Sequence, residues 1–528
     1  MTIRHLFAAA ALLAAVIPAA GQKDSLARNY RFAVETNPFL FLSNPAFMDT
    51  FQGRMALVQL DGQKDNGGLI SLNESPDSFQ GGAATESYFR VSDPLTFYGS
   101  LSWNYFSGKE MGGQILMDPE YNPVNFLENS ESNKGIKKQE HYQLAGAMSY
   151  RLGKKWAAGV RFDYTSADRT KIKDPRFSTI WMDIDIHAGV SFAPSDKWLV
   201  GLSVQYRNTL EQVRGGVYGT TDKQYYINTD KGGFWGTVAD LSGDLNHIPV
   251  TTPHYMNNNF VGGALQLVWN GRFSSELWAL MRSGYFGQKT STTPVFFEYN
   301  GVQAGYRGKL VLPAGKDLHV VSLSASMESL TNQENKFRYI TPTGQNTVVD
   351  YLSHDVILRR LSVTGELGYA WHKDAGGYEP SLTLGITLGG KMKDQTTTLF
   401  PFSRHHQVCT VACDLYGLKD FRAGKSLIGV EWHALAGGGF GIPKEDDTSA
   451  SAASTTLKSF DSYLNQQFEF DTALRAGGEI GVTYSLCIWK KIIPYVKLAD
   501  RYVHLLSALE YLASPYHNTA MLSIGCNF

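Results

Sequence analysis

The sequence predicts an all-β protein: a transmembrane antiparallel up-and-down β-barrel of about 18 strands (roughly 14–18 fit the pattern), with long extracellular loops and short periplasmic turns. Three observations predict it. Apolar and polar residues alternate over segments of about 9–13 residues. Glycine is abundant, with 52 residues, while charged residues make up only 18 %. Short and long connections alternate along the chain.

The alternation distinguishes a membrane barrel from a soluble sandwich. In the segment 156–164, large apolar residues such as Trp156 and Phe162 alternate with small or charged ones such as Gly159 and Arg161. A soluble sandwich has shorter strands, and its inner faces are apolar. Here one face of each strand is apolar and the other carries charges, which fits a lipid-facing outside and a wet lumen.

Eighteen segments have this pattern. Since no backbone edge can stay unpaired in lipid, we expect the last strand to pair with the first or with one near it. An even strand number puts both chain ends on the periplasmic side, where every short turn then falls. The expected strands are 53–62, 82–92, 95–106, 141–151, 155–165, 180–192, 197–208, 258–269, 275–286, 300–312, 317–328, 355–371, 379–390, 404–417, 425–440, 470–488, 491–503 and 516–528.

The N-terminus has the pattern of an export signal. Arg4 and His5 precede an apolar run of about a dozen residues, which is too short for a spanning helix, and small residues follow. We therefore expect a signal peptide over 1–21, a short N-terminal periplasmic or plug segment over 22–52, and the barrel over 53–528. The net charge of -1 gives no electrostatic reason to expect nucleic acid.

The chain ends on the strand-like stretch "NTAMLSIGCNF", in which Leu522, Ile524, Cys526 and Phe528 alternate with small or polar residues. This ending resembles the last strand of outer-membrane barrels, which their assembly machinery recognises through a terminal aromatic residue. The resemblance implies that Phe528 is the assembly signal. It also implies a Gram-negative outer membrane as the location, with its lipid and the barrel assembly machinery as partners.

A second resemblance lies at "NPA", residues 44–46, just before the first expected strand. This short box resembles the start of FadL-like long-chain fatty-acid transporters and of PorP/SprF-like barrels of Bacteroidota. Over its whole length the chain resembles an uncharacterised family of Bacteroidales outer-membrane proteins. That likeness implies the compartment and the fold, and brings no catalytic residues. Residues 22–52 are too few for the plug domain of a TonB-dependent receptor.

Charged residues on the polar strand faces are the candidates for lining the lumen. A catalytic interpretation needs a nucleophile and a base within reach of each other, and nothing in the sequence marks a nucleophile. We expect these charges to pair with one another, to brace the interior and to tune ion passage. The candidates are Arg161, Asp163, Asp183, Asp185, His187, Arg307, Lys309, Glu366, Glu431, His433 and Glu479.

The stretch "RHHQVCTVAC" contains possible metal ligands. On a strand, however, Cys409 and Cys413 lie roughly 13 Å apart, too far to share a metal or a disulfide, and the adjacent His405 and His406 point to opposite faces. We expect the two cysteines to face lipid, and we expect no metal and no cofactor. Cys487 and Cys526 fall on opposite strand faces, so we expect them not to pair.

The longest expected loop, 209–257, contains the aromatic residues Tyr225, Tyr226, Phe234 and Trp235. They are candidates for stacking on a sugar or an apolar ligand. The alternative is a loop that folds over the barrel mouth around its own aromatic core. The small-residue stretch 446–457 predicts a mobile surface loop.

Three functional classes fit these features. The first is a channel or FadL-like transporter for a small or hydrophobic solute. The second is a surface or secretion-system barrel whose long loops bind a protein partner. The third, a barrel hydrolase, has the least support, and we expect no enzymatic activity. Conductance of the purified protein discriminates the first class from the second.

Overall fold

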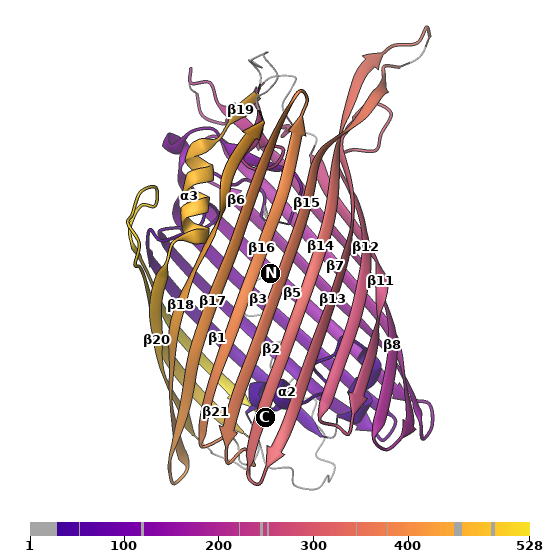
Figure 1. The fold of residues 1–528 in the computed structure, drawn as a ribbon, viewed down its shortest axis with the longest axis vertical. Helices are drawn as coiled ribbons and strands as arrows, with labels where there is room; N and C mark the ends of the chain where they lie inside the picture. The colour runs from indigo at the N-terminus through magenta and orange to yellow at the C-terminus, as the bar shows by residue number, and fades with distance from the viewer. Residues whose placement is uncertain are drawn as a thin grey trace.

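The computed structural model describes residues 29–51, 53–117, 121–220, 222–242, 247–250, 253–344, 346–376, 379–447, 457–486 and 492–528. Within them, 18 antiparallel strands form one closed barrel (Figure 1). Its strands are β1 (Arg54–Gly67), β2 (Asp77–Ser92), β3 (Leu95–Met111), β5 (Gly135–Arg151), β6 (Trp156–Lys171), β7 (Arg176–Ser195), β8 (Trp198–Gly216), β11 (His254–Trp269), β12 (Phe273–Gly287), β13 (Val295–Ala314), β14 (Asp317–Ile340), β15 (Val348–Lys373), β16 (Leu382–Leu399), β17 (Phe402–Ala423), β18 (Ser426–Asp447), β20 (Arg475–Leu486), β21 (Ile493–Leu505) and β22 (Tyr516–Asn527).

The barrel closes between its first and last strands, as predicted. β22 pairs with β1 from Leu57 opposite Asn527 to Gly67 opposite His517. The Phe528 backbone N–H continues the ladder by donating to the Ala56 carbonyl at 2.9 Å. Closure leaves no open sheet edge at this junction, as a barrel in hydrocarbon requires. The role of Phe528 as an assembly signal stays a prediction.

All 18 expected strands are present, but most extend further toward the loop end. β14 extends to Ile340, whereas the expected strand ended at 328. Its additional, mostly polar residues remain paired with β15 above the membrane. The expected strand 470–488 is wrong at its start: residues up to Thr472 belong to the helix α3 (Asp461–Thr472).

The connections differ at the two ends of the barrel. Tight turns such as the one between β17 and β18 lie at the end where β1 begins and β22 finishes. The long connections lie at the opposite, loop end. The expectation that every short turn lies at the first end is wrong for 172–175 and 400–401, which join strands at the loop end because both partners there extend to similar heights.

The outward face of the wall is apolar and has aromatic residues at the turn end. On β8, the outward side chains Val200, Leu202 and Val204 are all exposed. Near the turns, the Trp156 and Phe192 ring centroids lie 4.5 Å apart. Such a belt of apolar residues bounded by aromatic ones matches a lipid bilayer.

Several loops fold back over the wall and form a second sheet of β4 (Asn125–Glu128), β9 (Tyr226–Asp230), β10 (Trp235–Asp240) and β19 (Leu457–Ser459). A 3-10 turn, η2 (Glu131–Asn133), follows β4. Apolar residues of this sheet and its loops pack with inward residues of β7 to β16 in one buried cluster, the loop core. Its members include Ile115, Leu116, Phe126, Ile227, Trp235, Phe286, Phe297 and Leu358.

The N-terminal residues 29–51, the inner segment, contain the helix α2 (Tyr30–Thr36) and the 3-10 helix η1 (Pro45–Thr50). They lie inside the barrel near the turn end (Figure 1). The expected signal peptide 1–21 and residues 22–28 lie outside the described residues, as do Cys487 and most of the stretch 446–457.

None of the helices among the described residues is long and apolar enough to cross a membrane.

Candidate functional site: the barrel lumen

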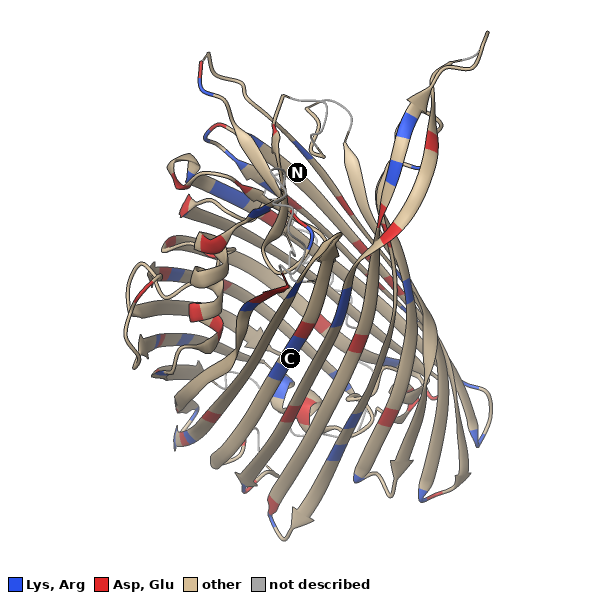
Figure 2. Cartoon of the chain, turned by 45° about the horizontal axis from the view of Figure 1, so that its top comes forward, with Lys and Arg blue, Asp and Glu red and all other residues tan. Residues whose placement is uncertain are grey.

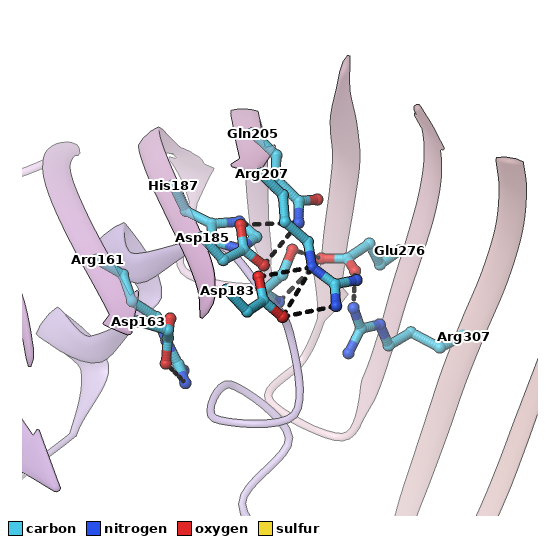
Figure 3. Close-up of polar contacts among 10 residues, drawn as sticks. Arg161, Asp163, Asp183, Asp185, His187, Gln205, Arg207, Glu276 and Arg307 are labelled. Carbon is cyan, nitrogen blue, oxygen red and sulfur yellow. Dashed lines mark hydrogen bonds and ion pairs between the residues drawn. The ribbon is translucent and has the colours of Figure 1, made fainter. Parts of the chain in front are cut away.

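Ion pairs line the lumen on β6, β7 and β8 (Figure 3). The Arg161 guanidinium donates to the Asp163 carboxylate at 2.7 Å, two residues along the same strand. Across neighbouring strands, Arg207 donates to Asp183 at 2.7 Å. These predicted lumen residues are thus brought together in pairs.

The third carboxylate of this group, Asp185, has two neutral or weakly basic partners. His187 Nε2 lies 3.2 Å from it, and the Gln205 amide donates to it at 2.9 Å. Alternation puts Asp183, Asp185 and His187 on one strand face, as expected. Figure 3 shows this cluster beside the Arg207 guanidinium.

Arg307 has a partner that the sequence interpretation missed. Its guanidinium lies 2.8 Å from Glu276, whose side chain is fully buried. Glu276 is the one carboxylate of β12, and only its register opposite Arg307 would have identified it. Lys309 instead donates to the Glu35 carbonyl of the inner segment at 2.5 Å.

The remaining predicted lumen residues lie on the other side of the barrel. His433 lies 3.0 Å from the Asp414 carboxylate. Glu431 forms an ion pair with Lys497. Glu479 stands opposite His433 on β18, and Glu366 lines the larger of the two cavities described below.

The inner segment is fastened to the wall through the "NPA" box. The Asn44 side-chain amide lies within 3.0–3.2 Å of the Val190 and Leu202 carbonyls and of the Gln266 side chain. A Cβ on Gly189 would lie 2.2 Å from Asn44 Oδ1, so only glycine leaves room for this contact. The short motif of the sequence therefore fits a matching place in the wall.

Charged groups fasten both sides of that box. Ser43 donates its hydroxyl and its backbone N–H to Glu276 at 2.6 and 2.9 Å. Asp49 forms ion pairs with Arg90 at 3.1 Å and Arg151 at 2.8 Å. Glu276 thus bridges Arg307 of the wall and Ser43 of the segment.

The helix α2 lies across the base of the lumen. The Tyr30 N–H donates to Asn527 Oδ1 on β22 at 3.1 Å, whereas the Phe32 ring meets His372 of β15 edge to face at 5.2 Å. Burial raises the pKa of Glu35 near the end of the helix. The inner segment thus touches opposite parts of the wall.

At the loop end, the connection between β3 and β5 enters the lumen. Its Tyr121 ring lies between two guanidinium groups, those of Arg282 at 4.2 Å and Arg207 at 5.8 Å. Arg282 and Arg360 both donate to the Tyr121 carbonyl and both contact Glu328. This buried network anchors the loop core to the wall.

The loop aromatics lie in or beside apolar clusters. Trp235 is a buried member of the loop core, Tyr225 packs against it, and Phe234 packs against Leu127 and Tyr463. Tyr226 begins β9, and its hydroxyl donates to Gln224. This packing resembles the second expected alternative, a loop with its own aromatic core; ligand contact by these four residues stays a prediction.

A histidine at the centre of the loop core is held neutral. The His247 ring lies among Phe126, Phe286, Phe296 and Phe297, with ring centroids 4.8–6.3 Å away. Burial, and then the nearby positive charge of Lys231, lowers the pKa of His247 to about 3.

Two cavities lie in the lumen among the described residues. The larger, of about 760 Å³, is bounded by β1 to β6 and by β15 to β22, and more than half of the residues that line it are polar or charged. Arg169, Glu366, Asp414, Arg475, Arg501 and His517 are among them. The smaller, of about 330 Å³, lies beneath the loop sheet against β15 to β17 and is lined by Asp230, Arg360, Lys391, Lys393 and His406.

The stretch that suggested metal ligands is divided between the two faces of β17. His406 lines the smaller cavity, and His405 lies 3.2 Å from Asp394. Cys409, Cys413 and Cys526 are free thiols. In the part of the chain that the structure describes, no cluster of three or more His, Cys, Asp and Glu side chains is arranged to hold a metal ion.

Comparison with known proteins identifies the family. Residues 45–528 match the model described as "Family of unknown function (DUF6850)", and the chain belongs to this family. No curated protein matches it.

Several solved barrels resemble the structure. They include the ferric preacinetobactin receptor BauA of Acinetobacter baumannii (9 % identity, 90 % of this chain and 80 % of that one, TM-score 0.38). The siderophore receptor PirA of the same organism is 9 % identical, with 90 % of this chain and 81 % of that one covered and a TM-score of 0.38. A Pseudomonas aeruginosa FadL homologue is 10 % identical, with 96 % of this chain and 99 % of that one covered and a TM-score of 0.33. At these scores and identities the likeness says nothing about what this chain binds.

Proposed function

We propose that the protein is an outer-membrane transport barrel whose larger cavity accepts a small solute during passage. The observation that supports this most directly is the cavity itself: about 760 Å³ of space with charged walls, within a barrel whose outside is apolar. Ligand sites commonly have volumes of about 300–1,000 Å³. Figure 2 shows both signs of charge interspersed on the strands and loops, so no single-sign field selects one type of ion at long range.

This proposal includes export through the signal peptide 1–21 and insertion into a Gram-negative outer membrane. The apolar belt and the closed sheet support the membrane location. The Bacteroidota source and the PorP/SprF-like features rest on the sequence resemblance. We also propose that the protein is not an enzyme, since among the described residues His187 and His433 each pair with a carboxylate but neither forms a hydrogen bond with a serine or cysteine nucleophile. Lipase or protease activity of the purified barrel would contradict this.

Conductance in a planar lipid bilayer tests the transport proposal. Arg501 lines the larger cavity and is exposed to the lumen, so Arg501→Gln should shift the reversal potential in a salt gradient toward cation preference. Glu366→Gln should shift it the other way. Arg338→Gln, on an exposed loop hairpin, is the matched control and should leave it unchanged. A non-conducting barrel that co-purifies with one protein would contradict the proposal.

A second candidate function, binding of a surface partner, is favoured by the hairpin of β14 and β15. Its tip projects beyond the other loops (Figure 1), and Tyr339 and Leu352 are exposed there. Shortening the hairpin by deleting 336–352 should abolish co-purification of such a partner while conductance persists. Unchanged co-purification would remove this candidate.

A further inference from the structure

The wall of the barrel has one irregular seam at its loop end. β18 and β20 pair from Ser426 opposite Leu486 to Gly437 opposite Arg475, where the pairing stops. β18 nevertheless continues to Asp447, paired there with β17 alone. Among the described residues, no strand therefore lies beside the β20-facing edge of β18 over about ten residues.

The helix α3 covers this edge in place of a strand (Figure 1). It leads directly into β20, and its C-terminal end lies close against β18. A Cβ on Gly438 would lie 3.2 Å from Leu474 Cα, and one on Gly439 would lie 3.0 Å from the Asp471 carbonyl oxygen. The seam is thus closed by packing of a helix against glycine backbone, without a ladder of the kind that joins the other strands.

Exposed apolar side chains surround the seam on the outside of the barrel. The Leu506 N–H donates to the Leu474 carbonyl, and Glu469 of α3 accepts from the backbone of 510–512, so the β21–β22 loop is tied to the seam. The exposed residues, the seam patch, are Phe440 (66 %), Leu474 (56 %), Leu506 (61 %), Leu509 (43 %) and Tyr511 (48 %). A cluster of this kind at the surface marks a contact with lipid or ligand.

The seam lies near the membrane surface. Tyr502 and Tyr516 stack at the outer ends of β21 and β22, with centroids 6.0 Å apart, and both face outward. Tyrosine rings in such positions mark the interface between acyl chains and headgroups. Tyr502 stands opposite Gly478, three residues from the end of the β18–β20 pairing at Arg475. The seam patch is therefore within reach of the outer leaflet.

The larger cavity reaches the seam from the inside. Its wall includes Leu435 and Gly437 of β18, Arg475 of β20 and Phe470 of α3, which are the residues at the base of the seam. The Arg475 guanidinium lies 4.8 Å from the Phe470 ring centroid, and Arg501 lies further down the same wall. Among the described residues neither arginine forms an ion pair, although the Asp471 and Glu74 carboxylates act electrostatically on Arg475 and Glu479 of β20 stands opposite Arg501. An apolar outer surface and two cationic groups inside thus meet at one place.

We propose that this seam is a lateral opening through which the larger cavity exchanges a single-chain amphiphile with the outer leaflet. The seam patch guides the apolar chain, and Arg475 and Arg501 bind an anionic head group, either a carboxylate or a phosphate. Displacement of α3 from the glycines of β18 opens the seam. This inference rests on the proposed transport function and names its class of solute.

Binding to the protein in lipid nanodiscs tests the head-group preference. We expect dodecyl phosphate or dodecanoate to bind, and neutral dodecanol to bind at least about tenfold more weakly, since a charge-assisted hydrogen bond is lost. Arg501→Gln should weaken binding of the anionic probe about tenfold, and Arg475→Gln should act in the same direction. The hairpin variant Arg338→Gln should bind as the unmodified protein does. The phosphate and carboxylate probes show which head group is preferred. Equal binding of dodecanol and both anions would overturn the proposal.

A reversible staple tests the route. In a background with the four native cysteines replaced by alanine, Gly438→Cys with Leu474→Cys places two thiols across the seam at disulfide distance. Oxidation should slow uptake of the labelled probe at least tenfold, and reduction should restore it. Val430→Cys with Val482→Cys joins the same strands below the seam and should have no effect.

The outcomes separate this inference from the proposed function. Ion conductance with no binding of either anionic probe would retain the transport barrel and overturn the lateral route. An oxidised staple that leaves probe uptake unchanged would overturn the route as well. Loss of conductance and of probe binding together would contradict both proposals.

Discussion

The two sides of the lumen differ although the strands that form them follow the same alternation. Between β7 and β15, the lumen at the loop end is filled by the loop core, with Phe126 and Leu116 fully buried against the wall. From β16 through β22 to β6, the corresponding space is the larger cavity. The difference lies in the loops: the described parts of 112–134 and 217–253 supply large apolar residues to the loop core, whereas 506–515 exposes Leu506, Leu509 and Tyr511 and buries Leu512. Whether the apolar residues of the loops pack inside the barrel or face outward therefore decides which part of the lumen remains an open cavity.

The largest effect should come from removing a large side chain on the filled side. Phe286→Ala deletes a ring that is fully buried and lies 4.9 Å from the Phe126 ring. The resulting cavity should reduce the free energy of unfolding by about 3–5 kcal/mol. Gln80→Ala, on the wall of the larger cavity, should change it by less than about 0.5 kcal/mol. Urea unfolding in lipid vesicles measures the free energy of unfolding of both variants. Equal losses would contradict the difference between the filled side and the cavity side of the lumen.

The second-largest loss of stability should come from a substitution in the buried network of Arg282, Arg360 and Glu328. Arg282→Met leaves the buried Glu328 with Arg360 as its remaining ion-pair partner, so we expect a loss of about 3 kcal/mol. Adding Glu328→Met should recover part of that loss, because it removes the carboxylate that has lost one partner but also takes this carboxylate away from Arg360. A double variant less stable than the single one would show that the network is a net stabiliser.

A smaller effect is expected for the inner segment. Asn44→Ala removes the amide that contacts β7, β8 and β11, and should cost about 1–3 kcal/mol of local stability. Hydrogen exchange of residues 29–51 should rise, while exchange in the loop core stays unchanged. Thr36→Ala, which removes a hydrogen bond within the segment itself, is the control. Faster exchange in the loop core of Asn44→Ala would show that the two regions are coupled.

The smallest effect should appear as a dependence on pH. His247 has its pKa lowered to about 3 in the folded protein, so the unfolded chain binds the proton first as the pH falls below the ordinary value of about 6.5. The stability that depends on neutral His247 is present above about pH 6.5 and is lost as the pH falls toward 3, by on the order of 1 kcal/mol at pH 6. His247→Phe should flatten this part of the unfolding profile. The same slope in both proteins would contradict the assignment.

Much of the wall could be predicted because its signal is local. Alternation at Trp198 to Tyr206 is set by the two-residue period of a strand in contact with lipid on one side, and it needs no knowledge of distant residues. The pair Arg161–Asp163 lies within one strand and Asp183–Arg207 joins two neighbouring strands, so the lumen candidates could also be chosen in advance. Glu276 could not, since its partners Ser43 and Arg307 are far from it in sequence.

The helix α3 is a second feature that the local sequence pattern could not predict. Its last residues, 470–472, fall within the expected strand 470–488. The helix forms where β18 has lost its neighbour and presents glycine backbone to it. Because this environment is formed by β18, which is distant in sequence, it could not be predicted from the residues of the helix itself.

The sequence by itself determined a closed barrel of about 18 strands with an apolar outside, because lipid demands a period of two on every strand and leaves no edge unpaired. The exact strand number came from the tertiary structure. Only the tertiary structure decided which loops enter the lumen, where the inner segment is fastened and where the wall has its seam. These features depend on contacts between residues such as Asn44 and Gly189, or Gly438 and Leu474, whose proximity follows from the order and register of the strands and not from their composition.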